Sequence, residues 1–270
     1  MELGIYLSAY ELLKHTNLKE EAIKCLFLSN KQSNAISLCK SHLDSSPNSI
    51  SLHCLLGDMA EDLDSKIRYY KKGLILSNNK SARALRSLGL LLIKESSTLK
   101  EGITMLEQSL EISSLHVSAW FVLACKYMES KQLNHALRCF ARVVALRDDD
   151  SEAWSNMGVC YMNSKKTKQA LLCFEQSLRI NRTNWKVWLN FLILALETQQ
   201  FGKSVQALHE LFSANKIKAV SCAMMARFGN LFLEWRESLQ SENKIDQIIQ
   251  NRRNKQVLII FKILKGFGDV

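Results

Sequence analysis

Several residues return unchanged after 34 positions in the middle of the chain, and this spacing constrains the fold more than any other feature. The pairs include Trp120 and Trp154, Tyr127 and Tyr161, Ala136 and Ala170, Cys139 and Cys173, and Phe140 and Phe174. Chance does not produce so many identical residues at one spacing, so the chain is built from a repeated segment. One such segment cannot bury its apolar side chains alone, and neighbouring copies must stack against each other.

The composition favours helices over strands. Of the 270 residues, 47% are apolar and 23% are charged, which is the balance of a globular protein with enough material for a core. Pro47 is the single proline, whereas average usage gives roughly 13 prolines in a chain of this length. Because sheet proteins and loop-rich enzymes use proline at turns, we predict an all-α fold.

The order of large and small residues within one repeat predicts how it packs. In residues 151–184 the order is Trp154, Met157, Gly158, Tyr161, Ala170 and Phe174, and in residues 117–150 it is Trp120, Leu123, Ala124, Tyr127, Ala136 and Phe140. The first residues of each set fall at helical spacing and form one apolar face. We expect Gly158 and Ala170 to let two antiparallel helices cross closely, and Phe174 to fill the space toward the next repeat. Trp154 and Phe174 are both expected to be buried.

This order resembles the tetratricopeptide repeat (TPR), a helix-turn-helix segment with a period of 34 residues. The resemblance implies a right-handed α-α superhelix, a TPR solenoid of about six helix pairs, in which these anchors are structural. Weaker copies carry Gly57, Gly89 and Trp188 as anchors. The expected repeats span 16–49, 50–81, 82–116, 117–150, 151–184 and 185–218, after an N-terminal helix in 1–15 and before C-terminal capping helices in 219–270.

The closing turns of the repeats differ from the usual pattern, which ends on proline. Pro47 holds that position in the first repeat, whereas Ser114, Asp148 and Arg182 hold it in later ones. We therefore expect these turns to rely on polar caps, such as the run from Asp148 to Ser151.

Several longer segments carry a more specific signature. They are Cys54-Leu55-Leu56-Gly57-Asp58, Tyr69-Tyr70-Lys71-Lys72, the stretch from Ser81 to Gly89, and the stretch from Asn181 to Asn190. These segments resemble the family of tetratricopeptide repeat protein 27, over roughly Leu12 to Phe212. The resemblance implies an intracellular helical scaffold that aids the assembly of larger complexes and has no catalytic residues. Members of that family are several times longer than this chain.

A stack of such helix pairs has a concave face lined by the first helix of each pair, at its second, fifth and ninth positions. The predicted partner-binding groove contains Arg83, Arg86, Leu90, Phe121, Cys125, Ser155, Asn156, Val159, Lys186 and Asn190. This groove is basic at one end and apolar further along, so we predict that it binds a protein partner through an acidic and apolar peptide or helix. Arg83 and Arg86, three residues apart on one helix, could hold an acidic or phosphate group. The alternative is that they face solvent or pair with an acidic neighbour.

The five-residue clamp with which co-chaperone repeats grip the C-terminal tail of heat-shock chaperones is largely missing. Its lysine, asparagine, asparagine, lysine and arginine correspond here to Phe121, Cys125, Asn156, Lys186 and Asn190. Only Asn156 and Lys186 match. Because a carboxylate needs both charge and paired donors, we predict no chaperone-tail binding.

No catalytic, cofactor or metal site is expected. The six histidines show no metal-ligand spacing, and the eight cysteines contain no C-x-x-C pair, so we interpret the cysteines as packed thiols. Neither a glycine-rich phosphate loop nor a nucleophile elbow is present. With no secretory leader and no apolar run long enough for a bilayer, reduced thiols indicate the cytoplasm or nucleus.

A formal charge of +10 keeps an alternative open, namely an RNA-binding helical repeat. Residues 216–270 hold ten Lys and Arg against five Asp and Glu, and include the basic run Arg252-Arg253-Asn254-Lys255. The groove positions vary without a code-like pattern. Any RNA binding would therefore act through phosphates and weaken strongly with salt.

Overall fold

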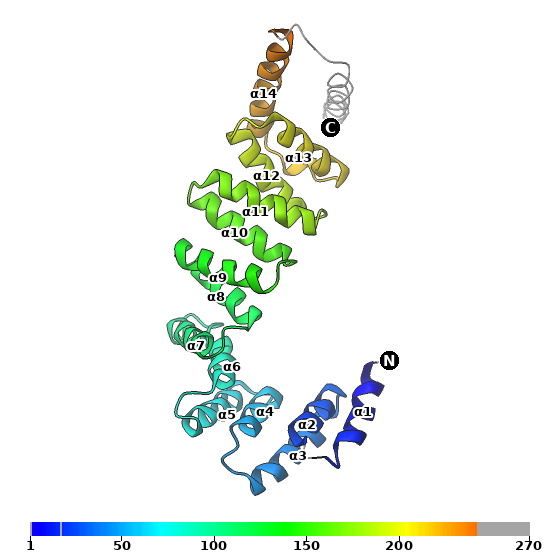
Figure 1. Cartoon of the computed structure of the whole chain (residues 1–270), viewed down its shortest axis with the longest axis vertical. Helices are drawn as coiled ribbons and strands as arrows, with labels where there is room; N and C mark the ends of the chain where they lie inside the picture. The colour runs from blue at the N-terminus through cyan, green and yellow to red at the C-terminus, as the bar shows by residue number, and fades with distance from the viewer. Residues whose placement is uncertain (1, 17, 242–270) are drawn as a thin grey trace. The chain divides into compact units, whose positions relative to one another are not determined.

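A computed structural model describes residues 2–16 and 18–241, and within these ranges the chain is helical with no strand (Figure 1). It divides into two compact parts, Met1–Ala119 and Trp120–Val270, which are described separately below as the first and second part. The predicted all-α fold of stacked helix pairs is confirmed. Helix α8 (Val117–Glu129) begins in the first part and continues into the second.

The first part is a series of helices in which each packs on the next along the chain. They are α1 (Glu2–Leu13), α2 (Lys19–Leu28), α3 (Gln32–Ser45), α4 (Ile50–Met59), α5 (Leu63–Leu76), α6 (Ala82–Leu92) and α7 (Leu99–Ile112). Helices α2 and α4, the first members of successive pairs, also contact each other. The closest pairing joins α6 to α7, where a Cβ atom added at Gly89 would lie 3.0 Å from the carbonyl oxygen of Gly102.

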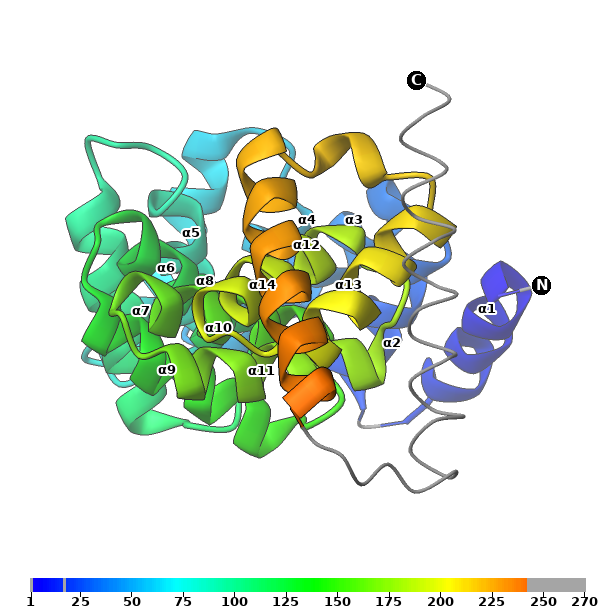
Figure 2. The same cartoon turned by 90° about the horizontal axis from the view of Figure 1, so that it is seen from above.

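The second part continues the same pattern. It contains α9 (Leu133–Leu146), α10 (Ser151–Asn163), α11 (Thr167–Ile180), α12 (Trp185–Glu197), α13 (Phe201–Ser213), the short 3₁₀ helix η1 (Ile217–Ala219) and α14 (Cys222–Ser241). Helix α14 lies beside α12 and α13 in both views (Figures 1 and 2). Phe228 of α14 stacks on Phe201 with the ring centroids 5.8 Å apart, so α14 covers the end of the last pair. The rest of the expected cap, including residues 252–255, lies outside the described residues.

In two helix pairs a ring of the second helix lies directly on a glycine of the first. In α10 and α11 the small residue is Gly158, where an added Cβ would lie 2.7 Å from Cε1 of Phe174. A Cβ on Gly57 would lie 2.5 Å from Cε1 of Tyr70 in the pair α4 and α5. Phe174 therefore packs on Gly158 of its own pair. It also reaches the next repeat, as expected, because it belongs to the apolar cluster that includes Trp188 of α12.

The expectation that Trp154 is buried was wrong. Trp154 is half-exposed, whereas Phe174 is 0% exposed and Trp188 is 4% exposed. The indole Nε1 of Trp154 donates a hydrogen bond to the carbonyl of Asp148 (2.9 Å), six residues earlier. The equivalent bond runs from Trp188 to the carbonyl of Arg182 (2.8 Å). The indole therefore fixes the closing turn, and this contact needs the edge of the ring rather than full burial.

His53 takes the place of tryptophan in its repeat. Its Nε2 lies 3.1 Å from the carbonyl oxygen of Pro47, again six residues earlier. Pro47, Asp148 and Arg182 occupy the closing position of three repeats. In each case a ring nitrogen lies within hydrogen-bond distance of the backbone carbonyl of that position, whatever side chain it carries.

Polar caps start the first helix of several pairs, as predicted for the run after Asp148. Asp150 accepts a hydrogen bond from the backbone nitrogen of Ala153 at 3.0 Å and pairs with Arg147. The caps of α4, α5, α6 and α12 are Ser49, Asp62, Ser81 and Asn184. Such caps satisfy backbone donors that a helix start leaves free. They let each pair begin without the missing proline.

Replacing Phe174 with alanine is expected to lower the free energy of unfolding by about 3–5 kcal/mol, since a fully buried ring is removed. Leu172→Ala is the matched control, because Leu172 is 60% exposed on the same helix and should change stability by less than about 0.5 kcal/mol. Urea unfolding followed by circular dichroism measures both. Trp154→Ala should cost less than Phe174→Ala, and equal losses would contradict the packing described above.

Two glycine-to-alanine changes are expected to have opposite signs. Gly158→Ala should destabilise by roughly 1–3 kcal/mol, because its new methyl group meets the Phe174 ring. Gly229→Ala in α14 meets nothing within 4 Å and should stabilise by about 0.5–1 kcal/mol through helix propensity. Thermal unfolding of both variants checks the prediction. Equal effects would mean that the ring does not rest on Gly158.

Candidate functional site

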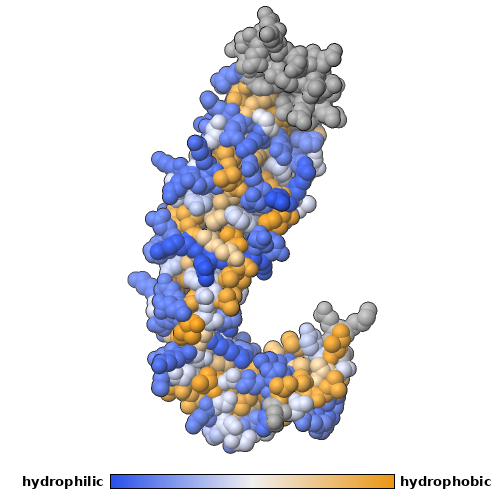
Figure 3. Space-filling view, in the orientation of Figure 1, coloured by the Kyte–Doolittle hydropathy of each residue, from blue (hydrophilic) through white to orange (hydrophobic). Residues whose placement is uncertain are grey.

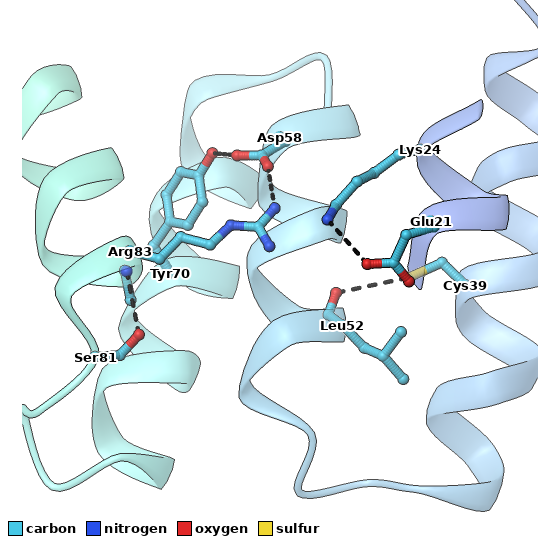
Figure 4. A network of polar contacts seen from close by, with 9 residues as sticks. Glu21, Lys24, Cys39, Leu52, Asp58, Tyr70, Ser81 and Arg83 are labelled. Carbon is cyan, nitrogen blue, oxygen red and sulfur yellow. Dashed lines mark hydrogen bonds and ion pairs between the residues drawn. The ribbon is translucent and has the colours of Figure 1, made fainter. Parts of the chain in front are cut away.

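The basic end of the predicted groove lies on α6, and only one of its two arginines has an acidic partner. Nη2 of Arg83 lies 2.7 Å from Oδ2 of Asp58 on α4. The hydroxyl of Tyr70 donates a hydrogen bond to Oδ1 of the same carboxylate at 2.6 Å. Figure 4 shows both side chains converging on Asp58. Arg83 therefore follows the alternative stated for it, namely pairing with an acidic neighbour.

Asp58 and Tyr70 are the contacts that sequence reasoning missed. Asp58 stands at the ninth position of the first helix in its repeat, which is one of the positions that line the groove. Extending the groove pattern to residues 50–81 would have found it. Burial and the hydrogen bond to Asp58 raise the pKa of Tyr70, so its hydroxyl stays protonated and keeps donating to that carboxylate.

Arg86 differs from Arg83. It is half-buried, and its Nη1 atom is shielded from solvent with no hydrogen-bond partner among the described residues. Burial and the neighbouring charge of Arg83 lower the pKa of Arg86. Burial and the charge of Arg86 in turn lower the pKa of His116. The charge of Asp58 acts on the pKa of Arg86 in the opposite direction, although the ion pair of Asp58 is with Arg83.

The groove residues of the second part form a more varied surface. Phe121 packs edge-on against Phe140, with centroids 5.8 Å apart. The thiol of Cys125 has a raised pKa, chiefly because of burial. Val159 packs partly against the core, and Lys186 is exposed with its Nζ 6.0 Å from the centroid of the Trp185 ring.

The polar members of this surface keep part of their side chains accessible. Ser155 and Asn156 of α10, Asn190 of α12 and Leu90 of α6 are all half-buried. Figure 3 shows apolar and hydrophilic residues interspersed on the visible face of each part. The first helices thus offer both kinds of contact to a partner.

Five of the eight cysteines are buried, whereas Cys222 is exposed. Burial raises the pKa of Cys39, Cys54, Cys160 and Cys173 to about 11, so these thiols stay protonated near neutral pH. Across the part of the chain that the structure describes, no three metal-ligating side chains lie together. In the same residues, no helix is both long and apolar enough to cross a bilayer.

The repeat pattern is matched by a family model. The model of the tetratricopeptide repeat covers residues 151–184, which correspond to α10, α11 and the turn that follows. These residues are a tetratricopeptide repeat. The match includes Gly158 and Phe174, the two residues whose contact holds this pair.

Curated relatives extend the similarity beyond one TPR. A tetratricopeptide repeat protein 27 homolog of Dictyostelium discoideum is 33% identical over 127 residues, which cover 47% of this chain and 14% of that protein. The tetratricopeptide repeat-containing protein trd-1 of Caenorhabditis elegans is 26% identical over 264 residues, or 95% of this chain. The predicted resemblance to the family of tetratricopeptide repeat protein 27 is confirmed. The chain spans 33% of the length of the nematode relative.

A solved structure supports the fold. YrrB, whose structure is titled as that of a TPR protein with an unusual peptide-binding site, aligns with a TM-score of 0.51 and 18% identity, over 72% of this chain and 97% of YrrB. At this identity the likeness shows the TPR fold alone.

Acidification is expected to destabilise the chain through His53. Its pKa lies below the ordinary value because of burial, so the folded chain binds fewer protons than the unfolded chain. Stability then decreases as the pH falls below about 6.5. In His53→Gln the decrease should be smaller, as measured by urea unfolding at pH 7, 6 and 5.

His15→Gln is the control, because His15 is exposed and its replacement should leave the pH dependence unchanged. If His53→Gln loses as much stability as the unmodified chain on acidification, His53 is not held neutral in the fold.

Proposed function

We propose that this chain is a non-catalytic interaction scaffold that binds a segment of a protein partner along its first helices and aids the assembly of larger complexes. The observation that carries the proposal is that some residues of a helix pair are buried by packing whereas others stay accessible. The anchors, such as Gly158 and Phe174, pack against each other within the stack. In α6, α8, α10 and α12 the second, fifth and ninth positions of the first helices keep partly accessible side chains, whereas Cys54 at the fifth position of α4 is buried.

The chemistry of this surface favours a partner segment that is acidic and partly apolar. The first part presents Arg86, whose charge has no carboxylate partner among the described residues. The second part presents Val159 and Leu189, which pack only partly against the core, beside the exposed Lys186. An acidic segment would suit the first part, and an amphipathic helix with apolar anchors would suit the second. All eight cysteines lie within the described residues and form no disulfide, which supports a place in a reducing compartment, the cytoplasm or the nucleus.

A bait experiment with charge-matched variants tests the proposal. The groove variant carries Ser155→Glu and Asn190→Glu, which place negative charge on α10 and α12. The control carries Gln169→Glu and Gln176→Glu on exposed positions of α11. Each variant is incubated with cell lysate at physiological salt, with and without nuclease, and captured proteins are quantified by mass spectrometry.

Proteins captured by the unmodified chain and by the α11 control, but lost at least tenfold from the groove variant, are the expected result, because like charges repel an acidic partner. Identical capture by the two variants would place binding elsewhere. Captures that disappear with nuclease would favour the RNA-binding alternative instead.

A further inference from the structure

The ring of Trp185, the first residue of α12, lies beside two positive charges in the second part. Nζ of Lys186 lies 6.0 Å from the centroid of this ring, and Nζ of Lys216, in the turn after α13, lies 5.8 Å from it. Both lysines are exposed, whereas Trp185 is half-buried. Two ammonium groups from separate turns of the chain therefore share one aromatic ring.

The surface around this ring is basic. Two stretches of the chain meet here, and neither contains an aspartate or glutamate. They are residues 176–196 and 211–226, and their five cations are Arg179, Arg182, Lys186, Lys216 and Lys218. The carboxylate of Glu210, just outside them, pairs with Arg182. Within the part of the chain that the structure describes, neither Lys186 nor Lys216 forms an ion pair, so both can bind an anion from solution.

The repeat does not require an indole at position 185. The same place in the two preceding repeats is occupied by Ser151 and Val117. In the repeat of α12 it is Trp188, not Trp185, whose ring binds the closing turn. Trp185 packs only partly against the core, so part of its ring stays accessible. This aromatic surface is available to a ligand.

We propose that Trp185, Lys186 and Lys216 form a contact site for single-stranded nucleic acid, in which a base stacks on the indole and the lysines bind the flanking phosphates. A lysine ammonium on a flexible stem can turn from the ring to a phosphate. Little is lost when it does so, because about 6 Å is the outer limit of a cation–π contact. This binding activity is separate from the scaffold proposal and does not rest on it.

The combination of groups favours a single strand over other polyanions. A nucleotide presents a flat base and a phosphate together, whereas an acidic protein segment would use the lysines but not the ring. In a duplex the bases are paired and stacked on each other, so none is offered to the indole. The absence of carboxylates from both stretches removes repulsion of a phosphate chain. Stacking and phosphate contacts tolerate any base sequence and weaken with salt.

The first test measures binding of the purified full chain to a fluorescein-labelled oligouridylate of about 12 nucleotides by fluorescence anisotropy. Trp185→Leu removes the ring and should weaken binding about tenfold, whereas Trp185→Phe keeps a stacking ring and should retain most of the affinity. Circular dichroism confirms that each variant is folded. Equal affinity of Trp185→Leu and the unmodified chain would overturn the proposal.

The contribution of the lysines is tested with a charge-matched pair of variants. Lys186→Gln with Lys216→Gln should weaken binding about tenfold and make its salt dependence less steep, because two phosphate contacts are lost. Lys166→Gln with Lys168→Gln removes the same charge at exposed positions at the start of α11 and should change the affinity less than twofold. Equal losses in the two double variants would reduce binding to an effect of net charge and overturn the site.

The class of ligand is tested by competition. Unlabelled oligouridylate and oligodeoxythymidylate should displace the probe, and the tighter of the two identifies the natural strand as RNA or DNA. A duplex of the same length and polyglutamate, at equal concentration of charge, should displace it at least tenfold less well. Displacement by polyglutamate as effective as that by oligouridylate would assign this surface to acidic proteins and overturn the proposal.

A bait experiment separates this site from the proposed function. Trp185→Leu is incubated with cell lysate under the conditions given above. It should lose the nuclease-sensitive captures of the unmodified chain and retain the nuclease-resistant proteins. Loss of the nuclease-resistant proteins alone would assign Trp185 to the protein partner, which would overturn the strand contact and leave the scaffold proposal standing.

Discussion

The contact between a small residue on one helix and a ring on the next is the interaction on which the rest of the structure depends. Gly158 leaves no room for a Cβ atom because Phe174 lies directly on its backbone, and Gly57 stands in the same relation to Tyr70. This close approach makes each pair of helices a rigid block with a defined crossing. Stacked blocks then bury the remaining apolar faces, since no pair could do so alone.

The ends of these blocks are fixed by polar contacts that repeat with the same period. The ring nitrogens of Trp154 and Trp188 bind backbone carbonyls six residues earlier, and His53 does so with an imidazole. Caps such as Asp150 satisfy the free backbone donors at the helix starts. These contacts are made to backbone atoms, so the side chain at the closing position can vary. This explains how the later repeats fold without proline.

The contacts that hold the stack together involve only part of each first helix. The remaining positions vary from repeat to repeat. In the first part they include two arginines and one aspartate, and Arg83 and Tyr70 both bind Asp58. In the second part they carry serine, asparagine, valine and lysine.

The sequence alone determined the all-α fold of stacked helix pairs, because a 34-residue period reflects contacts that are short in sequence and repeated. Only the tertiary structure decided which charges meet. Asp58 lies 25 residues before Arg83, and no local pattern shows that this carboxylate serves Arg83 and Tyr70 and leaves Arg86 unpaired. The half-exposed Trp154 was misjudged for the same reason, since its place depends on how a turn folds back on the helix rather than on helical spacing.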